Sequence, residues 1–327
     1  MAKGDIIYCT YFDRGFLLKG LALYASLIKH NPEAKLWILA FDKYTEKILK
    51  QMKLKGVTVV APEDFEDKEL LAVKPTRHIV EYYWTCTPSW ILYVMRKISS
   101  AKYVVYLDAD LYFFSDPGVG VAEIGEKSLL IVEHRFPKGR EGMAVNGKFN
   151  VAFNVFKNDK VGKICLERWR SQCLDWCYSK PAGGKLGDQT YLDEWPVLYE
   201  KDLVISKNVG VDIAPWNILQ YKITRRDSSV YIDRDPLICY HFHQFQILAP
   251  DKFSRVHGYL LSGQIIDNIY KPYEADILKQ YIKLKSTDPA FEINPASQYT
   301  LQILRQKLAK YLGPFYWKLK ALVYTLK

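Results

Sequence analysis

The sequence predicts an α/β fold in which a mixed, mainly parallel sheet is flanked by helices. Short apolar runs alternate with segments of helical periodicity through the first hundred residues. The 327 residues are 49% hydrophobic and 25% charged, an ordinary composition for a globular protein with one large or two smaller domains. Strands separated by helices imply right-handed crossovers, and these crossovers place neighbouring strands parallel.

The first half of the chain supplies most of the expected sheet. Its elements alternate in the order strand 5–10, helix 14–30, strand 35–41, helix 44–55, strand 57–61, helix 78–99 and strand 103–107. The apolar residues of each helix recur every three or four positions, which is the spacing of a buried helical face. Pro88 is expected to interrupt the long helix, because proline lacks the backbone N–H that the helix requires.

The second half has a mixed pattern. Its expected elements are strand 128–133, a mobile Gly-rich loop at 138–147, strand 149–156, helix 160–178, a polar loop at 180–187 and a strand near 237–242. After residue 250 the composition shifts to Lys, Tyr and Leu. We therefore expect one domain over 1–250 and a helical C-terminal extension over 251–327.

The apolar strand at 103–107 ends in two carboxylates, Asp108 and Asp110. Alternate side chains of an extended segment point the same way, so the two carboxylates are expected to converge. Like charges at one point need a shared proton or a cation, and Mg²⁺ or Mn²⁺ is the natural occupant beside substrate phosphates. A solvated turn is the alternative. The apolar run at 111–114 follows at once, which favours a site at the edge of the core.

Charge and cysteine usage limit the partners and the compartment. The formal net charge of +10 suits an anionic partner, such as nucleotide phosphates or an acidic membrane surface. The sequence contains no motif typical of nucleic-acid binding, so no nucleic-acid partner is expected. The six cysteines form no Cys-x-x-Cys pair and are predicted to be buried thiols. With no signal peptide before the first strand, the sequence predicts a cytoplasmic protein.

The segment 299–327 is a basic amphipathic stretch. Its leucines, with Phe315 among them, form a stripe that steps by three or four residues, and its charged residues are all Lys or Arg. Gly313 and Pro314 are expected to split it into two helices. Such a stretch suits peripheral attachment to the anionic inner face of the cell membrane. The alternative is that its apolar stripe packs on the rest of the chain, or on a second subunit of a homo-oligomer.

Five motifs occur in a characteristic order along residues 5–250. They are Asp108-Ala-Asp110 after a strand, Phe149-Asn150-Val-Ala-Phe-Asn154, Gly187-Asp188-Gln189, Asn208-Val-Gly210-Val-Asp-Ile-Ala-Pro-Trp216-Asn217 and Tyr240-His-Phe-His243. In this order and spacing the chain resembles GT-A glycosyltransferases, in the vicinity of the retaining family-8-like enzymes. The resemblance implies the Rossmann-like GT-A fold, and the segment after residue 250 adds nothing to it.

The resemblance implies a metal site. In such enzymes the Asp-x-Asp pair holds Mn²⁺ or Mg²⁺ against the diphosphate of a nucleotide-sugar, and a His from a later strand completes the site. By that match Asp108, Asp110 and His241 are the metal ligands. His243 lies on the same face of the same expected strand, and the sequence leaves open which of the two histidines binds the metal.

The resemblance also implies a nucleotide-binding region. The loop after the first strand holds the base and the ribose in similar enzymes, which makes Thr10, Tyr11, Asp13 and Arg14 candidates. Trp84 belongs to a stretch that lines the nucleotide pocket of similar proteins. For Asp13 the alternative is a helix N-cap, and the two roles are compatible.

Three residues are candidates for the donor sugar. Asp188 and Gln189 match the Asp-Gln motif that faces the sugar in similar enzymes, and Asp188 is the candidate to support an oxocarbenium ion. The alternative for Asp188 is an N-cap of the following helix. Asn150 lies on an apolar strand, where a buried amide needs hydrogen-bond partners, and sugar hydroxyls are candidates for them.

The resemblance therefore implies metal-dependent transfer of a sugar, with retention, from a nucleotide-sugar to a glycan or lipid-linked saccharide. UDP-sugars are the usual donors of such enzymes, and surface-glycan synthesis is the expected setting. One alternative is a sugar-phosphate nucleotidyltransferase. Such an enzyme would need a Gly-rich, basic loop after the first strand, whereas this loop carries a single glycine, Gly15. The other is a non-catalytic, membrane-associated binding protein.

Overall fold

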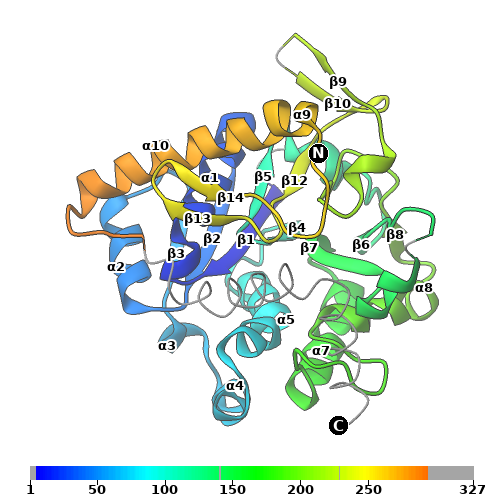
Figure 1. Ribbon diagram of the computed structural model, residues 1–327. Helices are drawn as coiled ribbons and strands as arrows, with labels where there is room; N and C mark the ends of the chain where they lie inside the picture. The colour runs from blue at the N-terminus through cyan, green and yellow to red at the C-terminus, as the bar shows by residue number, and fades with distance from the viewer. Residues whose placement is uncertain (1–4, 140, 228, 294–327) are drawn as a thin grey trace, which may run out of the picture.

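The computed structural model describes residues 5–139, 141–227 and 229–293, and a sheet flanked by helices forms its centre (Figure 1). The strands of this sheet are β1 (Ile6–Phe12), β2 (Lys35–Ala40), β3 (Val57–Val60), β4 (Tyr103–Leu107), β6 (Leu129–Glu133), β7 (Phe149–Lys157) and β8 (Leu203–Ile205). Their order is β3-β2-β1-β4-β7-β6-β8. Strand β7 runs antiparallel to both its neighbours, and the other pairs are parallel. The predicted mixed, mainly parallel sheet is confirmed.

Helices of very different length connect and cover the strands. The longer ones are α1 (Leu17–His30), α2 (Lys43–Met52), α5 (Ile79–Lys97), α7 (Lys160–Asp175) and α10 (Lys271–Thr287). The short α-helices are α3 (Pro62–Phe65), α4 (Lys68–Val73), α6 (Pro117–Ala122), α8 (Trp195–Leu198) and α9 (Gly263–Ile265). The remaining helical turns are η2 (Arg14–Phe16), η3 (Lys74–Thr76), η4 (Glu141–Asn146), η5 (Gln189–Glu194), η6 (Ile218–Gln220) and η7 (Ile266–Tyr270).

The expected interruption of the long helix at Pro88 is wrong, because α5 runs unbroken through this residue. An interior proline costs about 3 kcal/mol or more in a helix. Around Pro88, however, α5 buries a run of large side chains, among them Trp90 and Ile91. Each fully buried apolar side chain contributes roughly 1.5–3 kcal/mol. Tertiary packing therefore offsets the lost backbone hydrogen bond.

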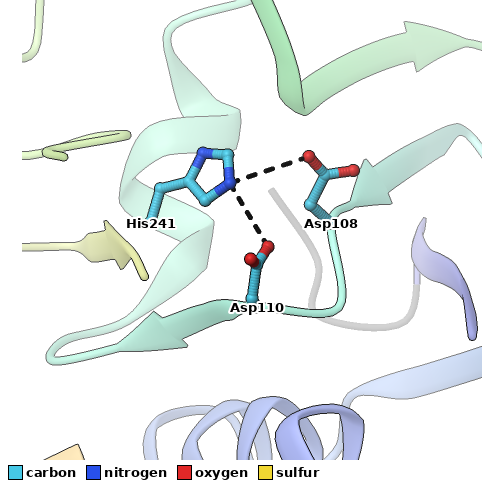
Figure 2. A group of neighbouring side chains, drawn as sticks. All are labelled: Asp108, Asp110 and His241. Carbon is cyan, nitrogen blue, oxygen red and sulfur yellow. Dashed lines mark ion pairs between the residues drawn. The ribbon is translucent and has the colours of Figure 1, made fainter. Parts of the chain in front are cut away.

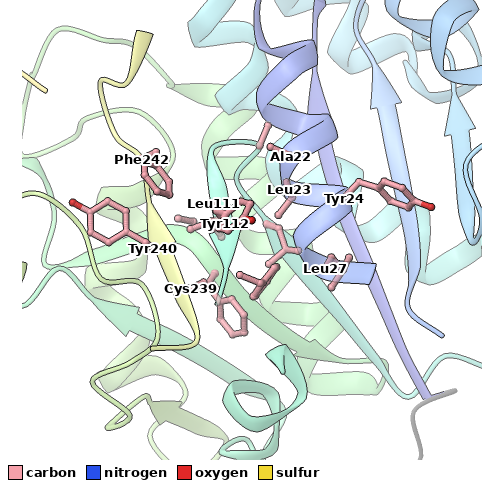
Figure 3. Packing of buried hydrophobic residues seen from close by; sticks show 14 of the residues in the cluster. Ala22, Leu23, Tyr24, Leu27, Leu111, Tyr112, Cys239, Tyr240 and Phe242 are labelled. Atoms are coloured by element: carbon pink, nitrogen blue, oxygen red, sulfur yellow. The ribbon is translucent and has the colours of Figure 1, made fainter. Parts of the chain in front are cut away.

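Beside the main sheet, a two-stranded antiparallel ribbon carries part of the second half of the chain. It consists of β5 (Leu111–Phe113) and β12 (Cys239–His241), and it pairs Leu111 with His241. Figure 3 shows Leu111 and Tyr112 between β12 and helix α1, and Phe242 on the other side of β12, and all three belong to one hydrophobic cluster. Because β5 follows Asp110 directly, this packing brings His241 next to the end of β4.

The remaining strands form two small sheets. They are β9 (Ile223–Arg226), β10 (Ser229–Ile232) and β11 (Asp235–Pro236) in one, and β13 (Gln246–Ala249) and β14 (Lys252–Ser254) in the other. The predicted loop at 138–147 contains the helical turn η4.

The segment after residue 250 packs on the first helix of the chain. Helix α10 contacts α1, and Tyr273, Ile277 and Leu284 join the hydrophobic cluster that contains Leu21 (Figure 1). The predicted C-terminal helix is confirmed, whereas the domain boundary near residue 250 stays a prediction. The basic stretch 299–327 lies outside the described residues.

Two further features bear on the sequence predictions. All six cysteines are buried and free, as expected for thiols. Within the described part of the chain, no helix combines the length and the apolar character that crossing a membrane requires.

Gly210 is a close-approach point on which the position of β12 depends. Its carbonyl oxygen accepts hydrogen bonds from the amides of Ile238 (2.8 Å) and Cys239 (3.1 Å). A Cβ atom at residue 210 would lie 2.0 Å from the carbonyl oxygen of Pro236, and a backbone atom cannot move aside cheaply. Only glycine therefore fits between this loop and the start of the ribbon.

We predict that Gly210→Ala lowers the free energy of unfolding by about 1–3 kcal/mol, because the chain must shift to relieve the contact. Denaturant or thermal unfolding measures the change. Gly263→Ala is the matched control, since no atom lies within 4 Å of the added methyl group there. Equal midpoints for the two variants would contradict the prediction.

Candidate functional site

The two aspartates at the end of β4 meet the histidine at the end of β12. Oxygen atoms of Asp108 and Asp110 and a ring nitrogen of His241 all lie within 4.8 Å of one another. Nε2 of His241 lies 3.2 Å from Oδ1 of Asp110 and 3.9 Å from Oδ2 of Asp108 (Figure 2). The aspartates are half-buried and His241 is buried, so the group opens to solvent on the carboxylate side. The predicted convergence of these side chains is confirmed.

The convergence arises from a turn and not from an extended strand. Strand β4 ends at Leu107, and Asp108 to Asp110 form a turn closed by a hydrogen bond from the Leu111 amide to the Asp108 carbonyl (3.1 Å). The Asp110 carbonyl then accepts from the Phe242 amide (2.9 Å). This second bond ties the turn to the chain just after His241, which fixes the imidazole relative to both carboxylates.

His243 lies outside this group. Its ring centroid is 5.9 Å from that of His241, and both rings contact Trp216 edge-on at 5.4 Å. Burial, together with the neighbouring His241, lowers the pKa of His243 to about 4. Of the two histidines that the sequence left open, His241 is therefore the one placed to share a cation with the aspartates.

The surroundings shift the pKa values of the two aspartates in opposite directions. Burial, together with repulsion from the Asp110 carboxylate, raises the pKa of Asp108 to about 6. Burial would also raise the pKa of Asp110, but attraction from His241 and Lys19 outweighs it and holds that pKa below its usual range. Such a cluster of carboxylates, with one partly neutralised, is a suitable cation site.

Two charged residues that the sequence analysis did not assign complete the surroundings. Lys19 on α1 is almost fully buried, and its Nζ lies 3.9 Å from Oδ2 of Asp110. Asp212 is fully buried, and its Oδ1 lies 3.5 Å from Nδ1 of His241. The sequence offers one signal for the burial of Lys19, which is its position within the otherwise apolar stretch 17–24 of a helix. Asp212 belongs to the motif at 208–217, but nothing in the sequence indicates that it would contact His241.

A fourth carboxylate, Asp188, is linked to the group through hydrogen bonds and one contact between tyrosine rings. The Thr87 hydroxyl donates to Oδ2 of Asp188 (2.8 Å), and the hydroxyls of Tyr11 and Thr87 are 2.9 Å apart. The Tyr11 ring contacts that of Tyr106 at 5.6 Å, and the Tyr106 hydroxyl donates to Oδ1 of Asp108 (2.9 Å). Residues from β1, α5, β4 and the loop before η5 thus converge on one place.

The Asp188 carboxylate is not a helix cap. Although the residue stands at the N-cap position of η5, its side chain accepts no capping hydrogen bond. Burial, together with repulsion from Asp108, raises the pKa of Asp188 to about 7. A buried carboxyl group that titrates near neutrality beside a cation site is a candidate functional group.

The candidate nucleotide residues lie at and just after the end of β1, and the side chains of Asp13 and Arg14 already have partners. Asp13 is the N-cap of η2, since its Oδ1 accepts from the Gly15 amide (2.9 Å), and its Oδ2 accepts from the Tyr83 hydroxyl (3.0 Å). The Arg14 guanidinium lies over the Tyr44 ring at 4.3 Å. Thr10 is fully buried, and its hydroxyl has no hydrogen-bond partner among the described residues.

The other candidates fall on either side of the group. The Gln189 amide donates to the Asn146 carbonyl, and Trp84 packs against Gly187, whose φ is +55°. The Nδ2 of Asn150 donates to Oδ2 of Asp212 (2.9 Å) and lies 3.2 Å from Nδ1 of His241. Asn150 is thus placed behind His241, which favours a supporting role over a contact with sugar hydroxyls.

Beside the two histidines, Trp216 also lines a pocket of about 240 Å³. The lining residues include Pro215, Leu219, Tyr259 and Leu260, and the last of these is 78% exposed. The pocket is therefore lined mainly by apolar and aromatic residues, with Gln220 as a polar member, and through Trp216 it adjoins the group around His241.

Comparison with known proteins finds two similar proteins of Bacillus subtilis (strain 168). "Uncharacterized protein YfnD" is 32% identical over 288 residues, which cover 87% of this chain and 92% of that protein. "Uncharacterized protein YfnF" is 33% identical over 258 residues, which cover 76% and 85% of the two chains. No family model matches the chain.

Among solved structures, the chain is similar to the galactosyltransferase LgtC, crystallised with donor and acceptor sugar analogues. The TM-score is 0.50 at 13% identity, over 83% of this chain and 94% of LgtC. At this identity the likeness concerns the fold. The predicted GT-A fold is confirmed.

We predict that His241→Gln weakens Mn²⁺ binding at least tenfold, whereas His243→Gln leaves it within about twofold. Loss of a partner of a metal ligand already costs 10–100-fold in affinity, and loss of a ligand should cost no less. Titration of free Mn²⁺ by electron paramagnetic resonance measures both dissociation constants. The reverse order would assign the metal to His243 instead.

Proposed function

The chain belongs to the same family as YfnD and YfnF, and we propose that it is a metal-dependent glycosyltransferase that uses a nucleotide-diphosphate sugar. The observation that carries the proposal is the Asp108–Asp110–His241 group at the carboxyl end of β4. In open α/β sheets, ligands bind outside the carboxyl ends of the strands, so the group stands where a donor would bind.

The residues of the group fit a divalent cation. Two carboxylates and one imidazole supply three ligands, and the half-buried carboxylates leave room for phosphate oxygens. The imidazole makes the set softer than the all-oxygen shell that Mg²⁺ prefers, so we propose Mn²⁺ first. When bound, such an ion acts as a Lewis acid that stabilises the negative charge of the departing nucleoside diphosphate.

The chain's own residues have separate tasks in this proposal. Lys19 holds a positive charge 3.9 Å from Asp110, on the side where the diphosphate charge would lie. Asp188, held by Thr87, faces the donor sugar and supports the positive charge that develops on it, as carboxylates do in glycoside hydrolysis. Gln189 and Trp84 border the same region.

The donor and the stereochemistry follow from the resemblance of the motifs. We propose a UDP-sugar, held by the loop with Tyr11 and Asp13, and retention of the anomeric configuration. The Tyr11 hydroxyl belongs to the hydrogen-bonded chain of Asp188, so a base bound at this loop would lie near the sugar subsite. Coupling constants of the product's anomeric proton test the retention.

For the acceptor we propose a glycan or a lipid-linked saccharide. The pocket beside Trp216 is apolar and aromatic, and sugar rings pack on aromatic faces. We also propose that the basic stretch 299–327 attaches the protein to an anionic membrane, where a lipid-linked acceptor would lie.

We predict that Mn²⁺ and one nucleoside diphosphate together raise the thermal midpoint, because a ligand of the native state stabilises it by mass action. In the presence of Mn²⁺, the protein should also release that nucleoside diphosphate from the corresponding nucleotide-sugar. Asp108→Asn and Asp110→Asn should abolish both effects, while the exposed control Asp251→Asn retains them.

Other outcomes separate the alternatives. Release of pyrophosphate from a nucleoside triphosphate and a sugar 1-phosphate would indicate a nucleotidyltransferase. Mn²⁺-dependent donor binding with no turnover on any acceptor would favour a binding protein. Unchanged donor binding in both asparagine variants would contradict the metal site itself.

We predict that deleting residues 299–327 releases the protein from vesicles rich in anionic lipid while Mn²⁺-dependent stabilisation remains. Each basic residue near such a surface contributes about 1 kcal/mol, and this segment is basic throughout. Co-sedimentation with vesicles of rising anionic fraction measures the attachment. Equal sedimentation of the full chain and the shortened chain would rule out this role.

A further inference from the structure

We propose that Asp212 positions His241 as a metal ligand by accepting a hydrogen bond from its protonated Nδ1 atom. The other ring nitrogen, Nε2, then presents its lone pair to the space between Asp108 and Asp110. The inference rests on the metal site of the proposed function, and it adds a residue for which neither the sequence motifs nor the comparisons give a role.

The imidazole stands between two carboxylates on opposite edges. Nδ1 lies 3.5 Å from Oδ1 of Asp212, and Nε2 lies 3.2 Å from Oδ1 of Asp110. The proton state of one ring nitrogen therefore determines what the other can do. A histidine that binds metal commonly donates its remaining N–H to a carboxylate, a carbonyl or water. Asp212 is the carboxylate in that place.

The backbone of Asp212 is held firmly in an uncommon conformation, and its side chain is buried. The residue is fully buried and has a left-handed φ of +55°, a conformation that is uncommon for residues other than glycine. Its carbonyl accepts from Nη2 of Arg135 (3.1 Å) and Nδ2 of Asn217 (3.3 Å). Its amide lies 3.2 Å from the Cys239 sulfur. Three side chains thus fix the backbone from which the carboxylate extends.

The carboxylate itself is only half satisfied. Oδ2 accepts the hydrogen bond from Asn150, but Oδ1 is buried and accepts no hydrogen bond from the described residues. A buried, incompletely paired carboxylate costs free energy, so the fold alone gives no reason to place one here. Nδ1 of His241 lies 3.5 Å from this Oδ1 atom, and a shift of a few tenths of an ångström would complete the bond.

Asn150 takes a supporting role in this arrangement. By holding Oδ2, it turns Oδ1 toward the imidazole. Its Nδ2 also lies 3.2 Å from Nδ1, which allows a rival arrangement in which Asn150 donates to Nδ1 and the ring proton sits on Nε2. That tautomer would direct a proton at the cation site and prevent binding through Nε2. The two arrangements differ in one measurable property, the protonated nitrogen.

The first experiment measures Mn²⁺ affinity in the full-length protein by electron paramagnetic resonance. Asp212→Asn keeps the shape and removes the charge, and we expect the dissociation constant to rise 10–100-fold. Asp233→Asn is the matched control, because Asp233 is exposed and has nearly the same backbone conformation, with φ +53°. The control should bind Mn²⁺ like the wild type. Thermal midpoints in chelator, similar for all three proteins, would show that folding is not the cause.

The second experiment needs no variant of Asp212. The chain has six histidines, so ring-¹⁵N-labelled histidine gives a readable nitrogen spectrum, with His241→Gln identifying the His241 signals. With diamagnetic Mg²⁺ bound, we expect Nδ1 to be protonated and Nε2 to be unprotonated. A proton on Nε2 would overturn the proposal, even if Asp212→Asn failed to fold.

The outcomes distinguish this inference from the function on which it rests. If the wild type binds no Mn²⁺, the proposed metal site fails, and the role of Asp212 fails with it. If the wild type binds Mn²⁺ and His241→Gln abolishes the binding, the metal site stands. Unchanged affinity in Asp212→Asn would then overturn the role of Asp212 alone.

Discussion

The structure depends on one electrostatic constraint, the gathering of three carboxylates around a single imidazole. Asp108, Asp110 and Asp212 all face His241 within 3.9 Å, in surroundings that are partly or fully closed to water. Carboxylates so close together repel one another unless positive charge compensates them. Lys19 lies 3.9 Å from Asp110, and its ammonium group compensates part of this repulsion. The remaining imbalance is what makes the place attractive to a cation.

Pairing of β5 with β12 brings these charged side chains together. Asp108 and Asp110 belong to the turn that leaves the main sheet, whereas His241 comes from a strand more than a hundred residues later. Pairing of Leu111 with His241 fixes the register, and burial of the ribbon against α1 stabilises it (Figure 3). The same helix carries Lys19, so one packing contact positions both a ligand and a counter-charge.

Sequence reasoning recovers the features that are local and misses those that depend on distant contacts. Periodicity gives the order of strands and helices, and the Asp-x-Asp spacing gives the two carboxylates that converge beside His241. Pro88 misleads, because the burial around it is a tertiary effect. Strand β8 is short and half-buried, so it leaves little periodic signal. The role of Asp212 could not be predicted, because it depends on contact with His241, which lies 29 positions later in the sequence.

The environment assigns different tasks to chemically identical groups along this edge of the sheet. Attraction from His241 and Lys19 keeps Asp110 ionised with a depressed pKa, as a cation ligand requires. Burial and the neighbouring Asp108 raise the pKa of Asp188 to about 7, where a carboxyl group can gain or lose a proton near neutrality. Carboxylates whose pKa values are pushed apart commonly have different roles in catalysis. A sugar transfer needs this division, because negative charge grows on the leaving phosphate while positive charge grows on the sugar.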